Sequence, residues 1–193
     1  GETWRNPYVT NQERQETDIQ GDAFSASFDN IMGSGFSAQI GIFNSEVDDE
    51  ESAYASLDRD GQGLYSKLAY AIPFTQQGKL ISAIKYTSFD ADGDAMSFDQ
   101  YGLKITLQKA IGRHLFSSSI GYDKARYDES NPVFDKELEE EQFSALIAYE
   151  YIDIMNWKNW SLISFAGFDY TSANIDFYEE REFITSVGVN YKF

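Results

Sequence analysis

The 193-residue sequence predicts an all-β protein, namely a transmembrane antiparallel up-and-down β-barrel. Three observations support this fold class. Apolar and polar residues alternate along about nine segments, as expected for strands with one apolar face. The connections between them alternate between short turns and long acidic loops, as in bacterial outer-membrane barrels. Each segment has about 9–12 residues, close to the length of a tilted strand that crosses a bilayer.

The first four strands are expected in two hairpins. Residues 17–30 carry the alternating Phe24, Ala26 and Phe28, and the turn MGSG leads to residues 36–44. After the loop SEVDDEESAYASLDRDGQG, residues 64–74 alternate and are joined through TQQG to residues 79–89. Glycine in both turns permits the tight reversal that a hairpin requires.

Five more strands continue this pattern. Residues 101–109 alternate most clearly, AIGR leads to residues 114–126, and the loop DESNPVFDKELEEE precedes residues 143–151. The segment DIMNWKN connects to residues 160–170, and TSANIDFYEE leads to the last strand, residues 182–193. A soluble β-sandwich is the alternative fold, but it does not require the regular alternation of loop lengths.

The expected strand number is odd, whereas bacterial single-chain barrels have an even number of strands. In this topology residues 1–16 would lie outside, before an inward-running first strand. We therefore expect residues 1–193 to form a single outer-membrane barrel domain that lacks upstream strands and is the C-terminal part of a larger barrel. A missed strand in residues 1–12 is the other explanation.

Composition excludes several classes of protein. The net charge of -17, from 32 Asp and Glu against 15 Lys and Arg, leaves no basic surface for nucleic acid. An aromatic content of 16% is too high for an acidic disordered chain. The chain has no cysteine, so disulfides and thiolate chemistry are absent. It also has no apolar run of about 18 residues that would form a transmembrane helix.

Four sets of segments resemble a family of outer-membrane proteins that carries a domain of unknown function. They are GETWRNPY, FDADGDAMSFD, YDESNPVFDK, and the C-terminal NWSLISFAGF, NIDFYEE and SVGVNYKF. The resemblance extends over nearly the whole chain. It implies a β-barrel with further upstream strands in a Gram-negative outer membrane, and it implies no activity or functional residue.

The apolar face of each strand is expected to contact lipid, between two aromatic girdles. The periplasmic girdle would contain Trp157, Trp160, Tyr191 and Phe193, and the external girdle Tyr86, Phe89, Tyr101, Tyr122, Tyr127 and Tyr170. In a sandwich these rings would instead meet in a core. The last strand, with Val187, Val189, Tyr191 and Phe193, is predicted to be the membrane-insertion signal that the outer-membrane assembly machinery reads.

Charged residues occupy the other face of the strands. Lys67, Lys85 and Lys104 fall on three successive strands, and Asp123, Glu150 and Asp169 on the next three. We expect these six residues to line the lumen, as a cationic wall opposite an anionic wall. Two interpretations remain open, namely a water-filled pore that selects solutes by charge and a narrow lumen filled with salt bridges.

The acidic loops suggest weaker hypotheses. Asp90, Asp92 and Asp94 surround Gly93 with oxygen ligands that suit Ca²⁺, although the order differs from an EF-hand loop. No other cofactor is expected. The remaining acidic runs would be solvated, or would share divalent cations with lipopolysaccharide.

The sequence gives little support for catalysis. The only histidine, His114, lies beside a short turn, and neighbouring Ser117, Ser118 and Ser119 read as strand residues. We therefore predict no enzyme but a passive porin-like channel for ions or small polar solutes. The alternative is a closed structural or surface-interaction barrel whose acidic loops bind cations, lipopolysaccharide or a protein partner.

Overall fold

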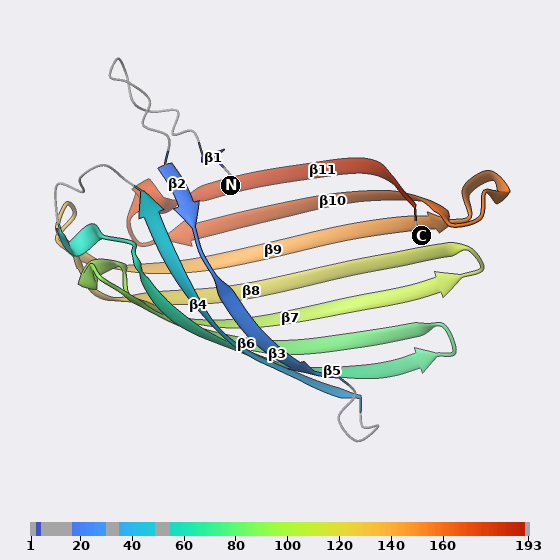
Figure 1. Ribbon diagram of the computed structural model, residues 1–193, viewed down its shortest axis with the longest axis horizontal. Coiled ribbons are helices and arrows are strands. Elements are labelled where there is room, and N and C mark those ends of the chain that lie inside the picture. Colours follow the sequence, from blue (N-terminus) through green and yellow to red (C-terminus); the bar gives the residue numbers. More distant parts are fainter. Residues whose placement is uncertain (1–2, 5–16, 30–34, 49–54, 192–193) are drawn as a thin grey trace, which may run out of the picture.

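The chain forms one large antiparallel sheet (Figure 1). The computed structural model describes residues 3–4, 17–29, 35–48 and 55–191. Its strands are β1 (Thr3–Trp4), β2 (Thr17–Gln20), β3 (Ala23–Phe28), β4 (Phe36–Asp48), β5 (Gly61–Thr75), β6 (Gly78–Ala91), β7 (Phe98–Ile111), β8 (His114–Asn131), β9 (Lys136–Ile152), β10 (Trp160–Ala173) and β11 (Glu180–Tyr191). Short 3₁₀-helices lie in the connections: η2 (Ala55–Leu57), η3 (Asp94–Met96), η4 (Ile154–Asn156) and η5 (Asp176–Tyr178).

The order of the strands confirms the predicted up-and-down fold. From β4 to β11 each strand pairs with its neighbours in the sequence, and every pair is antiparallel. Successive strands β2 and β3 both pair with β4, so they correspond to the single first strand expected over residues 17–30. The two-residue strand β1 adds a pairing to β2 that the alternation did not indicate.

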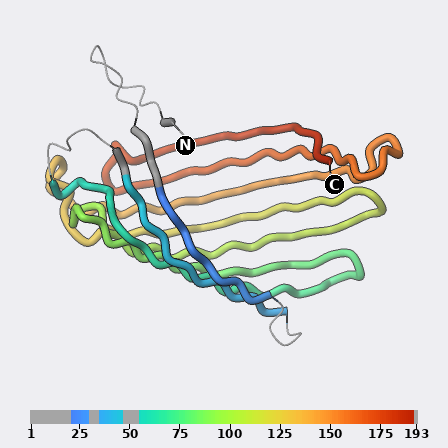
Figure 2. The backbone as a smooth tube through the Cα atoms, viewed as in Figure 1, coloured from blue at the N-terminus to red at the C-terminus, as the bar shows by residue number. Residues whose placement is uncertain are grey.

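The sheet is curved but open (Figures 1 and 2). In the described part of the chain, β11 pairs with β10 alone and β3 pairs with β4 alone. An open, curved up-and-down sheet is compatible with part of a barrel wall. No helix among the described residues is long and apolar enough to cross a membrane.

Several strands are longer than the alternation predicted. Strand β8 continues to Asn131, and β9 begins at Lys136, within the segment expected to be a loop. The charged residues there hide the apolar period, yet Lys124 and Arg126 still pair in register with Glu141 and Glu139. Cross-strand pairs of opposite charge stabilise an antiparallel ladder, so the hairpin extends beyond its apolar part.

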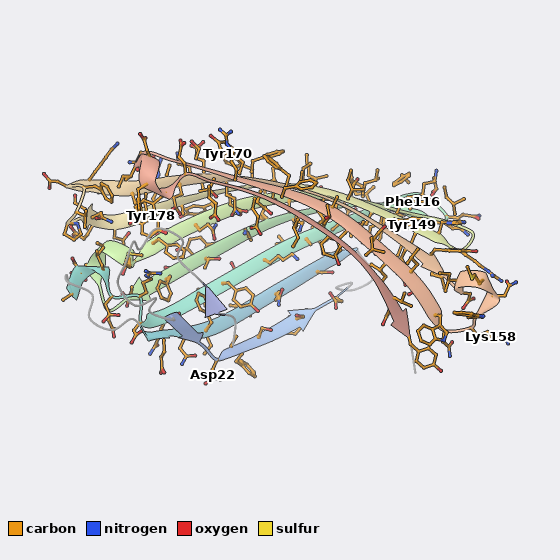
Figure 3. All side chains as sticks on the ribbon, turned by 90° about the horizontal axis from the view of Figure 1, so that it is seen from above. Asp22, Phe116, Tyr149, Lys158, Tyr170 and Tyr178 are labelled. Carbon is orange, nitrogen blue, oxygen red and sulfur yellow. The ribbon has the colours of Figure 1, made fainter. Side chains whose placement is uncertain are left out.

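The two faces of the sheet differ in polarity. The register places Phe116, Tyr149 and Tyr170 on one face, and Figure 3 shows them on the convex side. The convex face also exposes many large aliphatic and aromatic side chains. They include Ile40, Ile84, Leu103, Ile120, Ile147, Phe168, Phe183 and Val187. Among these, Ile147 is 67% exposed and Val187 is 74% exposed.

The buried apolar side chains of the described residues are few, and most lie at one end of the sheet. Except for Ala83 in mid-strand, they gather where the long loops begin. They are Phe89, Ala91, Ala95, Ala125, Leu138 and Ile175. We call this end of the sheet the loop end and the opposite end the turn end. This small loop-end core holds the connections in place. It leaves the apolar side chains of the convex face exposed.

Candidate functional site: the charged concave face

Three of the predicted lumen residues lie in one row across the concave face. The register places Lys67 opposite Lys85, Lys85 opposite Gly102, and Gly102 opposite Asp123. In an antiparallel sheet, residues that are directly opposite point to the same side. The row therefore changes from cationic to anionic across β7.

Lys85 and Asp123 form an ion pair although they are not on adjacent strands. Lys85 Nζ lies 2.8 Å from Asp123 Oδ1. Gly102 on β7 lies between them, and a Cβ atom there would collide with both side chains. Asp123 is buried, with 9% exposure, and the same Oδ1 accepts no hydrogen bond in the described part of the chain. Its charge therefore depends on the lysine, because burying an unpaired carboxylate is costly.

A second row lies two residues nearer the turn end. The register connects Ala83, Lys104, Gly121, Ser144, Asp169 and Glu182 across β6 to β11. Lys104 and Asp169 thus share a face and a row, with two strands between them. Neither they nor Lys67 takes part in an ion pair within the described residues. The charges of this row are available to water and solutes.

Glu150 lies apart from the other five predicted lumen residues. It is on the concave face but opposite Leu115 and Ile163, near the turn end. Eight residues separate it along β9 from Gln142, the partner of Asp123, which is about 27 Å of strand. The structure therefore brings together Lys67, Lys85, Lys104, Asp123 and Asp169, and leaves Glu150 at the other end of the same face.

Three further residues belong to this face and were not among the site residues predicted from the sequence. Glu182 lies opposite Asp169, so alternation along β11 would have identified it as part of the anionic side. Gln39 lies opposite Lys67, and its amide nitrogen donates a hydrogen bond of 3.0 Å to the Tyr65 hydroxyl. The Tyr65 ring covers Gly41 on the neighbouring strand, and sequence periodicity does not reveal such a contact.

An aromatic row crosses the concave face at the loop end. The rings of Phe43, Phe89, Phe98 and Tyr127 follow one another with centroid separations of 5.8, 5.6 and 5.3 Å. Phe43 covers Gly63 on the strand between β4 and β6. The predicted external girdle is therefore wrong at Phe89 and Tyr127. Their alternation places them on the concave face, whereas Tyr86, Tyr101, Tyr122 and Tyr170 are on the convex face.

The aromatic row ends at a carboxylate. The Tyr127 hydroxyl donates a hydrogen bond of 3.3 Å to Glu140. Burial raises the pKa of the Glu140 carboxyl, and the hydrogen bond from Tyr127 partly opposes this effect. Burial and the nearby Glu140 charge also raise the pKa of the Tyr127 hydroxyl. The two groups form a partly desolvated polar site where the strands meet the loops.

The loops at this end are fastened by side-chain hydrogen bonds. Asn131 is almost completely buried, with 2% exposure. Its side-chain Oδ1 accepts a hydrogen bond from the backbone N–H of Val133, and its side-chain Nδ2 donates one to the Tyr178 hydroxyl, both 2.9 Å long. Phe134 and Phe177 pack nearby with ring centroids 5.9 Å apart. The connections after β8 and β10 therefore form a defined surface.

The predicted calcium ligands lie around η3. Asp90 is in β6, Asp92 follows it, and Asp94 begins η3. Among the described residues, no group of three or more His, Asp or Glu side chains is arranged to hold a metal ion. Glycine at position 93 has another role, because a Cβ atom there would collide with the backbone of Ser56 and Asp58.

The turn end of the convex face is aromatic. His114 Nδ1 lies 2.8 Å from the Tyr149 hydroxyl, and its ring stacks on Tyr151 with centroids 4.8 Å apart. The ring of Trp160 lies 5.0 Å from that of Tyr191. Val187 and Val189 are exposed on the same face of β11. Phe193, the last residue of the predicted insertion signal, lies outside the described residues.

Comparison with models of protein families identifies a family for this chain. The family described as "Protein of unknown function (DUF2860)" matches residues 1–192. A search of curated proteins found no match. The family match covers the whole described sheet and confirms that the four sets of sequence segments belong to a family with a domain of unknown function. The chain belongs to the DUF2860 family.

Proposed function

We propose that the protein is an integral β-barrel of the bacterial outer membrane and that its concave face lines a passive channel for ions or small polar solutes. The observation that supports this proposal is the separation of polarity between the two faces. The convex face is mostly apolar and exposed, whereas the concave face carries opposed rows of charge. This is the polarity of a barrel with lipid outside and water inside.

The convex face supports the membrane part of the proposal. Soluble monomers rarely expose an apolar patch larger than a few hundred Å². Here exposed apolar side chains occur on every strand from β3 to β11. On β8 the apolar stretch runs from His114 to Tyr122, about 26 Å along the strand. Aromatic residues lie at both limits, as in the girdles of outer-membrane barrels.

The concave face supports the channel part. Opposite charges lie across the curved wall, with Lys67 and Lys104 on one side and Asp169 and Glu182 on the other. None of the four forms an ion pair within the described residues. In a water-filled lumen such charges would set up a transverse field and select solutes by charge. The Lys85–Asp123 pair between them is internally neutralised, so it would contribute less to selectivity.

Planar-bilayer conductance of the full-length protein tests the channel. The informative variant is Lys67→Glu/Lys104→Glu, which reverses two unpaired charges and leaves the Lys85–Asp123 pair intact. The matched control is Lys109→Glu/Lys158→Glu, with one residue on the convex face and one in the turn before β10. We expect discrete openings, a higher cation preference in the first variant, and no change in the control. Equal selectivity in both variants would contradict this lining of the pore.

A second candidate function is a closed barrel that acts through its external surface. The loop-end core and the Asn131–Tyr178 hydrogen bond favour it, because they give the loops a fixed shape. A barrel that folds and inserts but never conducts would exclude the channel and favour this function. In that case reversing Lys67 and Lys104 would alter stability alone.

A further inference from the structure

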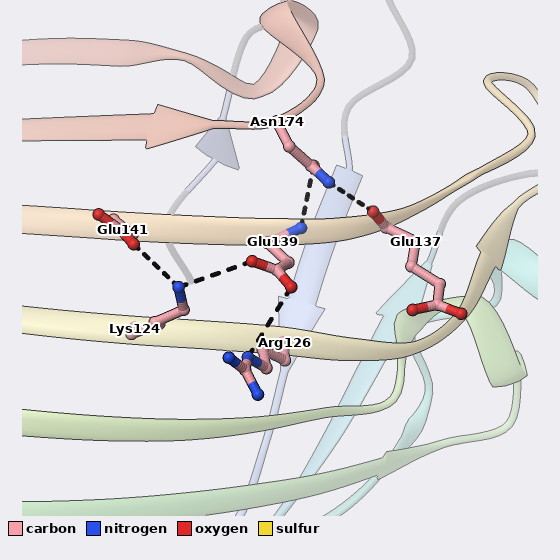
Figure 4. A network of polar contacts seen from close by, with 6 residues as sticks. All are labelled: Lys124, Arg126, Glu137, Glu139, Glu141 and Asn174. Carbon is pink, nitrogen blue, oxygen red and sulfur yellow. Dashed lines mark hydrogen bonds and ion pairs between the residues drawn. The ribbon is translucent and has the colours of Figure 1, made fainter.

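Four charged side chains form a cluster on the convex face at the loop end (Figure 4). Lys124 and Arg126 on β8 lie directly opposite Glu141 and Glu139 on β9. Lys124 Nζ is 2.9 Å from Glu141 and 3.6 Å from Glu139, and Arg126 Nε is 3.8 Å from Glu139. We call these four residues the convex charge patch.

The position of this patch is unusual for the face on which it lies. The same side of β8 carries Phe116, Ile120 and Tyr122, and the same side of β9 carries Phe143 and Ile147. The charges begin two residues beyond Tyr122, about 7 Å along the strand. In the proposed membrane orientation they would stand next to the headgroups of the external leaflet, just outside the aromatic girdle.

The cations of the patch retain unused binding capacity. The Arg126 side chain is 68% exposed and makes no hydrogen bond within the described residues, and Glu139 approaches only its Nε atom. A guanidinium whose terminal nitrogens are open is suited to bidentate binding of a phosphate. Arg181 adds a third cation on the same face, where it lies 5.0 Å from the centre of the Tyr170 ring.

The carboxylates of the patch fit the same ligand. Glu139 and Glu141 are each about half exposed at their side chains, so they present oxygens to solvent. Magnesium and calcium ions bind such carboxylates together with the phosphates of a substrate or lipid. A headgroup that carries phosphates and divalent cations would therefore satisfy both signs of charge in the patch.

We infer that the convex charge patch binds the phosphorylated headgroup of a glycolipid in the external leaflet, together with its divalent cations. This inference rests on the proposed insertion into an outer membrane but not on conduction. A lipid rather than a free phosphate is favoured by the adjacent apolar surface. Tyr122 and Phe143 lie immediately below the charges, where acyl chains would pack, and both side chains are exposed.

The test uses the full-length protein in phosphatidylcholine vesicles with added bis-phosphorylated lipid A and Mg²⁺. Protease protection first establishes whether the protein inserts. Lipid A that remains bound is then measured by mass spectrometry after mild extraction. We expect Lys124→Ala/Arg126→Ala to retain about tenfold less, the loss of about one charge-assisted hydrogen bond. The control Lys109→Ala/Lys158→Ala, at the turn end of the sheet, should retain as much as the wild type.

The outcomes separate the two proposals. Failure to insert would contradict the outer-membrane function itself. If the protein inserts and both double variants retain equal amounts of lipid A, lipid binding by the convex charge patch is contradicted, but the outer-membrane function is not. Equal retention of dephosphorylated lipid A would show that the phosphates are not recognised, and full displacement by inorganic phosphate would show a simple anion site. Glu139→Gln/Glu141→Gln should remove the Mg²⁺ dependence while the protein still inserts.

Discussion

Lys85 Nζ lies 2.8 Å from Asp123 Oδ1 although strand β7 separates their two strands. The pair is possible because Gly102 leaves the surface of β7 bare at the crossing point. The ion pair on the concave face therefore depends on the absence of a side chain at Gly102. Sequence alternation alone would have assigned Gly102 no more than a small inward residue.

Gly102→Val should lower the free energy of unfolding by about 1–3 kcal/mol, as overpacking does elsewhere. The new side chain would collide with Lys85 and Asp123 and force the pair apart. The matched control is Gly188→Val on β11, where an added Cβ atom meets nothing within 4 Å. Urea unfolding of both variants in lipid vesicles measures the difference. Equal stabilities would show that the crossing tolerates a side chain.

Removing the two partners of the ion pair should have unequal effects. Lys85→Ala leaves Asp123 buried without its cation, and we expect a loss of about 3 kcal/mol. Asp123→Ala leaves a lysine side chain that is 45% exposed and can be hydrated, so the loss should be below about 1 kcal/mol. The same unfolding experiment compares the two. The reverse order would mean that Asp123 is hydrated in the folded protein.

The proposed membrane orientation predicts that a charge on the convex face opposes insertion into a bilayer. Ile120 is 53% exposed on this face, in the middle of the apolar stretch of β8. Ile120→Arg should cost about 2–4 kcal/mol if the residue faces the bilayer midplane. Ser119→Arg places the same charge one residue away on the concave face and serves as the control. Folding yield into vesicles, followed by gel mobility, distinguishes them, and equal yields would contradict the lipid-facing assignment.

Asn131→Ala should loosen the loop end without unfolding the sheet. The change leaves the Val133 backbone N–H and the Tyr178 hydroxyl without their partner, at a cost of about 1–3 kcal/mol. We expect faster proteolysis between β8 and β9 in the variant while far-ultraviolet circular dichroism is unchanged. Tyr178→Phe removes only one of the two hydrogen bonds and should give an intermediate rate. Unchanged proteolysis in both would mean that these bonds do not hold the loops.

Glu140 should make the loop end sensitive to pH. It lies beyond Phe143 at the loop end of β9, and burial raises the pKa of its carboxyl. Because the pKa of the Glu140 carboxyl is higher in the folded protein, its contribution to stability is complete below the ordinary glutamate pKa of about 4.3. This contribution is lost as the pH rises through the pKa of the folded protein. Glu140→Gln should therefore be more stable than the wild type at pH 7, with the difference closing near pH 4. A constant difference in thermal unfolding across this range would contradict burial of a charged carboxylate.

The apolar period predicted the strands and their faces because it repeats along the central part of each hairpin. It failed where other interactions decide the structure. The ends of β8 and β9 are stabilised by cross-strand charge pairs, which have no apolar period. The strand register places Phe89 and Tyr127 on the concave face, so aromatic character alone misplaced them in the girdle. The Lys85–Asp123 pair spans three strands, and only the register reveals it.

Strands β4 to β11 are paired in sequence order, and this connectivity affects how the fold can evolve. Each strand in this range is bonded to its sequence neighbours, and the turn within a hairpin sets the register of that hairpin. Duplication or loss of one whole hairpin would therefore keep the direction and pairing of every other strand. The width of the sheet, and with it the circumference of the proposed barrel, can vary in steps of two strands without a new fold.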